Sequence, residues 1–201
     1  VDGKYNSKGA EAKSGKSVAF ESAAGGGYAI VDGGALYESL GVDKAQRHML
    51  VAFFEPEKNE AIISTLDDIK SSAEHTYTWQ ANIGSADEQK WMADLKPPVP
   101  VIPADDNVKV TAGTEGGRPI FLLEGRNNGF VKGWVLEPVD AKITAGDPLQ
   151  IETASTDAKI WVVMFVGSGR PPVAQISGSG MQTVLNIGDR TASFDGSRLV
   201  V

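Results

Sequence analysis

A strict alternation of apolar and polar residues between His75 and Ile83 constrains the fold of this chain more than any other feature. The large apolar residues of this stretch fall on one face of an extended backbone: Tyr77, Trp79, Ala81 and Ile83. Polar residues occupy every position between them. A period of two is typical of a β-strand with one face buried and one face in water. The stretch therefore predicts a half-buried strand.

Short apolar runs, separated by turn residues, repeat along the rest of the chain. The runs 46–54 and 61–69 flank a polar turn at 55–59 and are predicted to pair as a hairpin. The best candidate for a helix, of one or two turns, lies near 34–40. Further strands are predicted at 17–22, 28–31, 108–112, 119–124, 130–136, 149–153, 159–166, 173–177, 181–187, 191–194 and 198–201. This rhythm indicates an all-β protein, an antiparallel β-sandwich of many short strands with little helix.

One irregular stretch, 84–106, interrupts this rhythm. It ends in four prolines at positions 97, 98, 100 and 103, which exclude helix and disfavour a central strand. We expect an ordered excursion over the surface of a single β-sandwich domain spanning 1–201. If the chain holds two sheets or subdomains, 84–106 is where they divide.

Composition excludes several classes of function. The chain has no cysteine and only two histidines, His48 and His75, so thiol chemistry is excluded and a histidine-rich metal site is not expected. A net charge of -7 argues against nucleic acid as a partner, because phosphates require a basic surface. No apolar run approaches the ~18 residues of a membrane span, so we expect no membrane partner.

Candidate site residues are few, and each has a structural alternative. Arg126 and Asn127 stand before an Asn-Gly turn, which favours a hairpin tip; the functional alternative is a polar loop that contacts sugar hydroxyls or a carboxylate. Trp134 is a candidate for stacking on a sugar ring, whereas Trp161, inside an apolar run, is predicted to be core.

Histidines and paired carboxylates complete the search for reactive groups. His75 is predicted to be a rim residue held by a backbone group; its catalytic alternative requires a partner within hydrogen-bond reach. His48 is predicted to be a structural residue within its strand. Adjacent strand residues point to opposite faces, so Asp67 and Asp68 are not expected to act together as a glycosidase pair.

Several stretches, in the same order, resemble the C-terminal β-sandwich of the heparinase II/III-like polysaccharide lyases. The first is the opening Val1-Asp2-Gly3-Lys4-Tyr5-Asn6, which is similar to the end of a family segment that begins His-Asn-Thr. The others are 27–37 with 46–51, the run from Leu66-Asp67-Asp68-Ile69 to His75-Thr76-Tyr77-Thr78-Trp79-Gln80, and the closing 189–201.

This resemblance implies a lyase that cleaves uronic-acid polysaccharides, alginate-like or glycosaminoglycan-like, by β-elimination. In the family, the base, the acid and the neutralising group come mostly from an N-terminal helical toroid, and a His-x-His-x-Asp segment of the sandwich binds a metal. That segment is absent here, so we expect no catalytic residue, no metal ligand and no cofactor in this chain; a divalent metal would belong to an upstream segment. Lys4, Tyr5 and Asn6 match the family segment and are expected near the substrate cleft.

The expected function is therefore that of the non-catalytic, C-terminal sandwich of a larger lyase, inactive alone and secreted or periplasmic. Its expected partners are an acidic polysaccharide, the helical toroid and upstream sandwich strands. The negative charge favours carboxylate-only sugars such as alginate over sulfated ones. The alternative is a stand-alone carbohydrate-binding or structural β-sandwich. An exposed apolar face, where a toroid would dock, distinguishes the two.

Overall fold

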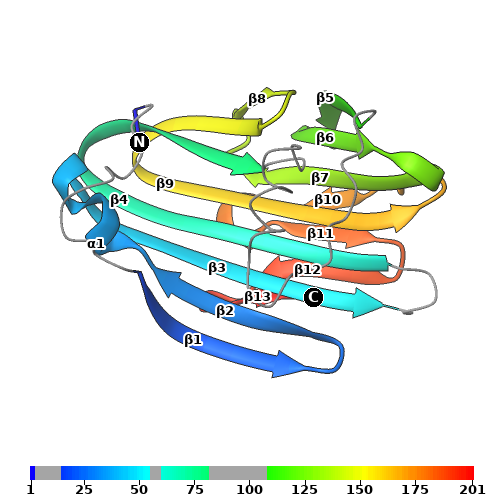
Figure 1. Ribbon diagram of the computed structural model, residues 1–201, viewed down its shortest axis with the longest axis horizontal. Coiled ribbons are helices and arrows are strands. Elements are labelled where there is room, and N and C mark those ends of the chain that lie inside the picture. Colours follow the sequence, from blue (N-terminus) through cyan, green and yellow to red (C-terminus); the bar gives the residue numbers. More distant parts are fainter. Residues whose placement is uncertain (3–14, 55–59, 82–107) are drawn as a thin grey trace, which may run out of the picture.

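A computed structural model describes residues 1–2, 15–54, 60–81 and 108–201 (Figure 1). Nearly all of this part of the chain is antiparallel β-structure. Its largest helical segment is α1 (Gly34–Tyr37), continued by the 3-10 turn η1 (Glu38–Leu40), where the sequence predicts a short helix. The stretch 84–106, with its predicted surface excursion and subdivision, lies outside the described residues.

Nine strands form one large sheet. Its order is β1-β2-β3-β4-β9-β7-β6-β5, and β8 pairs with β9 beside this path. Every pairing in it is antiparallel. The strands are β1 (Lys16–Ala23), β2 (Gly26–Asp32), β3 (Val42–Phe54), β4 (Glu60–Ala81), β5 (Lys109–Glu115), β6 (Arg118–Glu124), β7 (Gly129–Glu137), β8 (Lys142–Thr144) and β9 (Leu149–Ser168).

Four short strands form a second sheet behind the first, as Figure 1 shows. They are β10 (Gln175–Ser177), β11 (Val184–Ile187), β12 (Arg190–Phe194) and β13 (Leu199–Val200). Apolar residues of the two sheets meet in one core, to which the large sheet contributes Leu66, Trp134 and Trp161 and the small sheet Leu185 and Leu199. The predicted all-β sandwich is confirmed, and burial of this core is its main stabilising contribution.

Two strands are far longer than predicted. β4 has 22 residues and joins the predicted strand 61–69 to the described part, 75–81, of the predicted strand 75–83. β9 has 20 residues and joins the predicted strands 149–153 and 159–166. Between the halves, pairing passes from Lys70–Asp157 to His75–Ser155, so β4 carries three more residues than β9 over this interval. An excess of this kind bends a strand without ending it. Both strands turn sharply at the end of the molecule near α1 (Figure 1).

The bend folds the large sheet over its own face and encloses a second core. Side chains from beyond the bend, including Tyr77, Trp79 and Ile151, cluster with Phe121 and Ile160 from the rest of the sheet. The rings of Trp79 and Phe121 lie with centroids 6.4 Å apart. The large sheet is therefore covered on one face by the small sheet and on part of the other by its own folded end.

Candidate functional site

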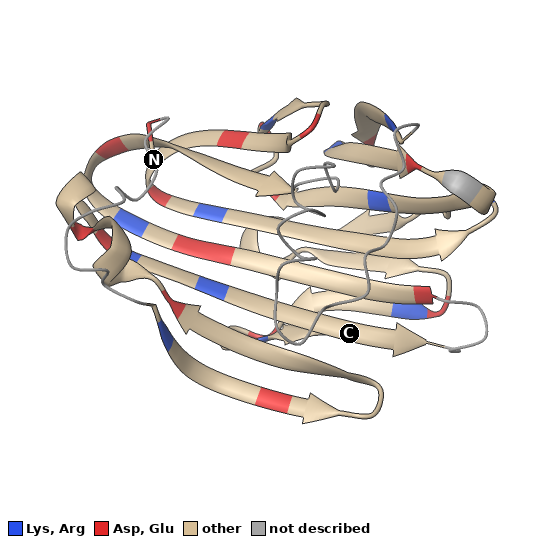
Figure 2. Ribbon diagram, viewed as in Figure 1, with Lys and Arg blue, Asp and Glu red and all other residues tan. Residues whose placement is uncertain are grey.

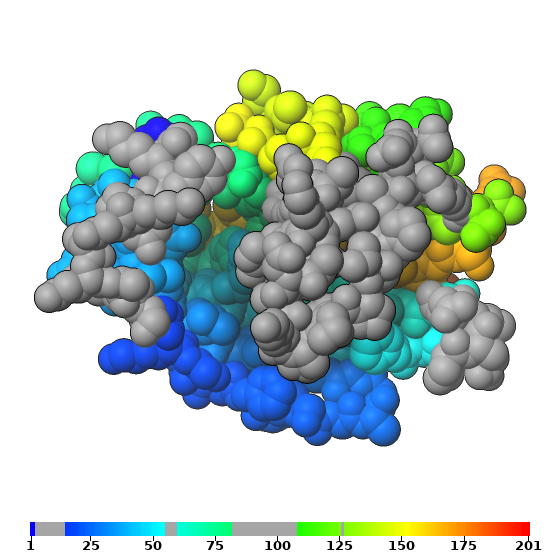
Figure 3. All heavy atoms as spheres, viewed as in Figure 1, coloured from blue at the N-terminus to red at the C-terminus, as the bar shows by residue number. Residues whose placement is uncertain are grey.

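A hollow of about 330 Å³ lies where the folded end of the large sheet, its main part and α1 meet. We call it the α1 hollow. Leu36 and Tyr37 of α1, Arg47 and Asp67 of the main sheet, and Thr78 from beyond the bend are among its lining residues. Figure 3 shows the surface set back beside the atoms of α1 and β3.

The turn before α1 places the helix against the sheet. The backbone N–H of Gly34 donates to Oδ1 of Asp32 over 2.9 Å, and the N–H of Gly33 donates to the carbonyl of Ala45 over 2.7 Å. These bonds tie both ends of the turn to β2 and β3, because Asp32 and Ala45 belong to those strands. Tyr37 packs against the second core, and it also lines the hollow.

Arg47 and Asp67 form a two-point ion pair in the wall of the α1 hollow. They are directly opposite on β3 and β4, and Nε and Nη2 of Arg47 each donate to a different oxygen of Asp67 over 2.6 Å. Such a two-point pair is among the stronger hydrogen-bonded contacts in proteins. The bond to Asp67 raises the pKa of Arg47. The arginine side chain is 45 % exposed and the aspartate only 11 %, so the carboxylate lies behind and the guanidinium faces solvent.

Asp2 and His75 form a second polar group next to the hollow, since Val1 lines it. Oδ2 of Asp2 lies 2.8 Å from Nδ1 of His75, and its Oδ1 accepts the backbone N–H of Thr76 over 2.8 Å. The contact with His75, followed by the one with Thr76, lowers the pKa of Asp2. The prediction that a backbone group holds His75 is wrong, because a carboxylate distant in sequence holds it.

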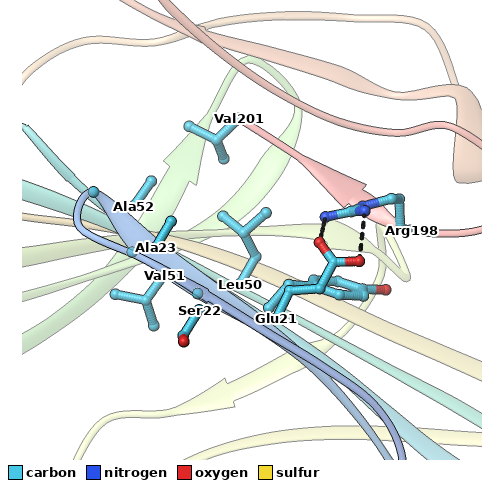
Figure 4. Close-up of a pocket in the computed structure, with 12 residues that line it drawn as sticks. Glu21, Ser22, Ala23, Leu50, Val51, Ala52, Arg198 and Val201 are labelled. Atoms are coloured by element: carbon cyan, nitrogen blue, oxygen red, sulfur yellow. Dashed lines mark hydrogen bonds and ion pairs between the residues drawn. The ribbon is translucent and has the colours of Figure 1, made fainter.

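A smaller hollow, of about 280 Å³, lies between the β1–β2 hairpin, β3 and the end of the chain. Figure 4 shows Arg198 and Glu21 joined on its rim, with N–O distances of 3.0 and 3.3 Å, and Leu50 beside them. The guanidinium of Arg198 also lies over the ring of Tyr28, 4.7 Å from its centroid. The rest of the wall is mostly small residues and backbone, which gives this hollow little capacity for polar recognition.

His48 lies behind that wall, in the core. Its Nδ1 is 2.7 Å from the hydroxyl of Tyr28, and both side chains are buried. Burial lowers the pKa of His48, so the imidazole is neutral at pH 7. His48 is a structural residue, as the sequence predicts.

The predicted substrate-binding residues do not gather at the α1 hollow. Lys4, Tyr5 and Asn6 lie outside the described residues. Arg126 and Asn127 belong to the 3-10 turn η3 (Arg126–Asn128) between β6 and β7, at the end of the large sheet opposite α1 (Figure 1). The backbone φ of Asn127 is 56°, which fits a hairpin tip. Sugar contact by this tip stays a prediction.

Trp134 corrects the sequence analysis. It is 0 % exposed, and its Nε1 donates to Oε1 of Glu115 over 2.8 Å. A sugar ring has no access to this indole, so the predicted stacking role is wrong for Trp134. Trp161 is buried in the same core, as predicted.

Glu115 also binds an unexpected buried lysine. Nζ of Lys132 donates to Oε2 of Glu115 over 2.6 Å and to the carbonyl of Pro172 over 2.8 Å. Burial by itself would raise the pKa of Glu115, but the bonds from Lys132, Trp134 and the Ala174 N–H outweigh it and the pKa is lowered.

The adjacent carboxylates of Asp67 and Asp68 are each paired with basic side chains rather than with one another. Asp68 bonds to Nζ of Lys44 over 2.5 Å and to Nζ of Lys159 over 2.6 Å, while its neighbour Asp67 bonds to Arg47. Figure 2 shows this acidic segment of β4 between basic segments of β3 and β9. The two carboxylates thus bond to separate partners, as expected of adjacent residues in a strand. Within the described ranges, no three His, Cys, Asp or Glu residues converge as metal ligands.

Sequence reasoning missed Tyr37 and Arg47 as residues of one site. A signal for Arg47 was present, since pairing β3 with β4 symmetrically about the turn 55–59 places position 47 opposite 67. Nothing in the sequence placed α1 beside this pair.

Comparison with known proteins gives a likeness of fold. No protein-family model and no curated protein matches the sequence. Among solved structures, the heparan sulfate lyase HepC from Pedobacter heparinus is similar with a TM-score of 0.56 at 12 % identity, over 92 % of this chain and 27 % of that one. A mutant of the same lyase gives 0.53 at 11 % identity, with the same coverage of both chains.

A crystal structure of heparinase III is also similar, with a TM-score of 0.52 at 10 % identity over 88 % of this chain and 26 % of that one. This chain thus spans about a quarter of the length of these enzymes. No helix in the described part is long and apolar enough to cross a membrane. The chain therefore has a β-sandwich fold similar to part of the heparan sulfate lyases.

Proposed function

We propose that this chain is the β-sandwich part of a polysaccharide lyase that cleaves a uronic-acid polysaccharide by β-elimination, and that it binds substrate without cleaving it alone. The observation that carries the proposal is the fold likeness to a heparan sulfate lyase over 92 % of this chain. The sequence stretches that resemble the heparinase II/III-like lyases, in the same order, also support it.

The burial of several proton-transfer candidates supports a non-catalytic role. β-Elimination needs a base for the proton beside the carboxylate, an acid for the leaving oxygen and a group that stabilises the developing charge. Tyr28 and His48 are bonded to each other inside the core, where no substrate carbon reaches them. The hydroxyl of Tyr77 is also buried and donates to Ser71. Of the described residues, neither histidine lines the α1 hollow.

An exposed apolar face supports a packing partner. Phe20 is opposite Ala29 on β2, and Ala29 is opposite Met49 on β3, so all three share one face of the large sheet. Val31 and Phe53 share this face because they are an even number of residues from Ala29 and Met49. Phe20 is 73 % exposed and Phe53 58 %. Contiguous exposed apolar residues are typical of interaction surfaces, and we propose that a helical domain covers these.

The choice of polysaccharide follows from charge. With a net charge of -7, the chain is repelled by dense sulfate more than by carboxylate alone. We therefore propose an alginate-like substrate ahead of a sulfated one, and a secreted or periplasmic location, where such polymers are met.

Affinity electrophoresis through gels containing alginate, heparin or chondroitin tests this function. We expect retardation by alginate that exceeds retardation by heparin. In parallel, the ultraviolet absorbance of the unsaturated product should stay flat with each polymer. Migration unaffected by every acidic polymer would contradict the proposed function.

A stand-alone carbohydrate-binding module is the alternative, and the presence of a polar, aromatic-lined hollow favours it. The exposed apolar face separates the two. If the face is a docking surface, Phe20→Ser with Phe53→Ser should leave alginate binding unchanged but abolish association with the helical domain of a heparinase III-type lyase. A wild-type chain that shows no association with such a domain, yet binds alginate, would favour the free module.

A further inference from the structure

The Arg47–Asp67 pair gives the α1 hollow donors and acceptors side by side. A guanidinium has five N–H donors, and an ionised carboxylate has about four acceptor positions. The bonds between Arg47 and Asp67 use two of each. Arg47 is half exposed and Asp67 lies behind it. The N–H donors and acceptor positions that the pair does not use therefore lie at one edge of the hollow.

We propose that the α1 hollow binds one pyranose ring through its hydroxyl groups, and not through a carboxylate. This inference rests on the proposed function and names the part of the polysaccharide that the hollow recognises. A vicinal diol both donates and accepts, so it matches a neighbouring guanidinium and carboxylate. A uronate carboxylate only accepts.

Electrostatics favour the diol. An anion that approaches Arg47 also approaches Asp67, whose oxygens are 2.6 Å from the guanidinium, so attraction and repulsion largely offset each other. A neutral hydroxyl loses nothing to this repulsion. Asp67 thus holds the N–H donors of Arg47 in a fixed orientation, and the net charge of the pair stays close to zero.

The other walls suit the apolar side of a sugar ring. Leu36, Tyr37 and Ile69 line the hollow, and the ring of Tyr37 offers a flat apolar surface with a polar end. Thr78 contributes a hydroxyl from the far wall. The volume of about 330 Å³ is at the small end of ligand pockets, roughly 300–1,000 Å³, and suits a single ring better than an extended oligosaccharide.

Titration with two disaccharides tests the inference: cellobiose, which is uncharged, and a mannuronate disaccharide, which carries two carboxylates. Chemical-shift changes of the full chain give the dissociation constants at low and high salt. We expect both to bind with constants within about threefold of each other and with little salt dependence, because hydroxyl recognition is not screened.

Two variants locate the binding. Val31→Trp adds bulk at the exposed rim of the hollow and should raise both dissociation constants at least about tenfold. Asp67→Asn frees the charge of Arg47, so it should weaken cellobiose binding and make mannuronate binding stronger and salt-dependent. Lys44→Gln is the control, because Lys44 neighbours Ala45 on β3 and therefore points to the opposite face.

Each outcome decides the inference. It is overturned if neither disaccharide binds, if only mannuronate binds and salt abolishes that binding, or if Val31→Trp binds as the wild type does. Should Asp67→Asn fail to fold, the rim variant alone decides. Retardation by alginate is measured separately. If Val31→Trp is still retarded by alginate and still binds both disaccharides as the wild type does, the α1 hollow is not the sugar-binding site, but the proposed function stands.

Discussion

Tyr28 and His48, on neighbouring strands, are joined by a 2.7 Å hydrogen bond inside the sandwich. Burial raises the pKa of Tyr28, although the backbone of Leu199 opposes this shift. The pair therefore links β2 and β3 through a neutral histidine.

Stability should fall on mild acidification because of His48. Its pKa in the folded chain is lowered by burial, whereas an unfolded histidine titrates near pH 6.5. The unfolded state thus binds more protons, and stability present above about pH 6.5 is lost as the pH falls toward the folded pKa. Urea unfolding between about pH 8 and pH 5 measures this. The loss should be reduced in His48→Gln; an unchanged profile in that variant would assign the effect to other groups.

Glu115→Ala should be strongly destabilising. The side chain of Lys132 is only 8 % exposed, so without Glu115 its buried charge loses the carboxylate that it contacts, and Trp134 loses its hydrogen-bond acceptor. Breaking a buried pair in this way costs about 3–5 kcal/mol. Glu124→Ala is the matched control: its contact with Lys109, at 3.8 Å, is exposed, and such pairs contribute roughly 0–1 kcal/mol. Equal losses in the two variants, by urea unfolding, would show that the buried network is not important.

Gly133→Ala tests the contact between β6 and β7. A Cβ at position 133 would stand 2.1 Å from the ring of Phe121, which itself packs against Trp79. Overpacking of this kind typically costs about 1–3 kcal/mol. At Gly25, nothing lies within 4 Å of an added Cβ, so Gly25→Ala should change the unfolding free energy by less than about 0.5 kcal/mol. A neutral Gly133→Ala would mean that Phe121 is free to move aside.

The sequence pattern predicted those strands and hairpins that depend on residues close together in the chain. The alternation around Tyr77 and Trp79 identified a half-buried strand, and the turn predicted at 55–59 indicated the pairing of β3 with β4. The long strands were not predicted because the segment between Lys70 and His75 is polar enough to look like a turn. A bulge leaves no sequence signal of its own, because it depends on the partner strand having fewer residues.

Longer-range contacts account for the other differences. Trp134 alternates with Lys132 on β7, and a lysine at an inward position suggests the wrong face for the strand. The buried charge of Lys132 is stabilised by Glu115, which belongs to the hairpin of β5 and β6. The α1 hollow has the same origin, since its walls meet only when β4 and β9 bend.

The central claim, that this chain binds an acidic polysaccharide but does not cleave it alone, is tested most directly by one measurement. The purified chain is incubated with alginate while bound polymer and unsaturated-product absorbance are followed in the same sample. The account predicts bound polymer and a flat absorbance trace. Sustained growth of the absorbance would contradict it, because the chain would then carry its own base and acid.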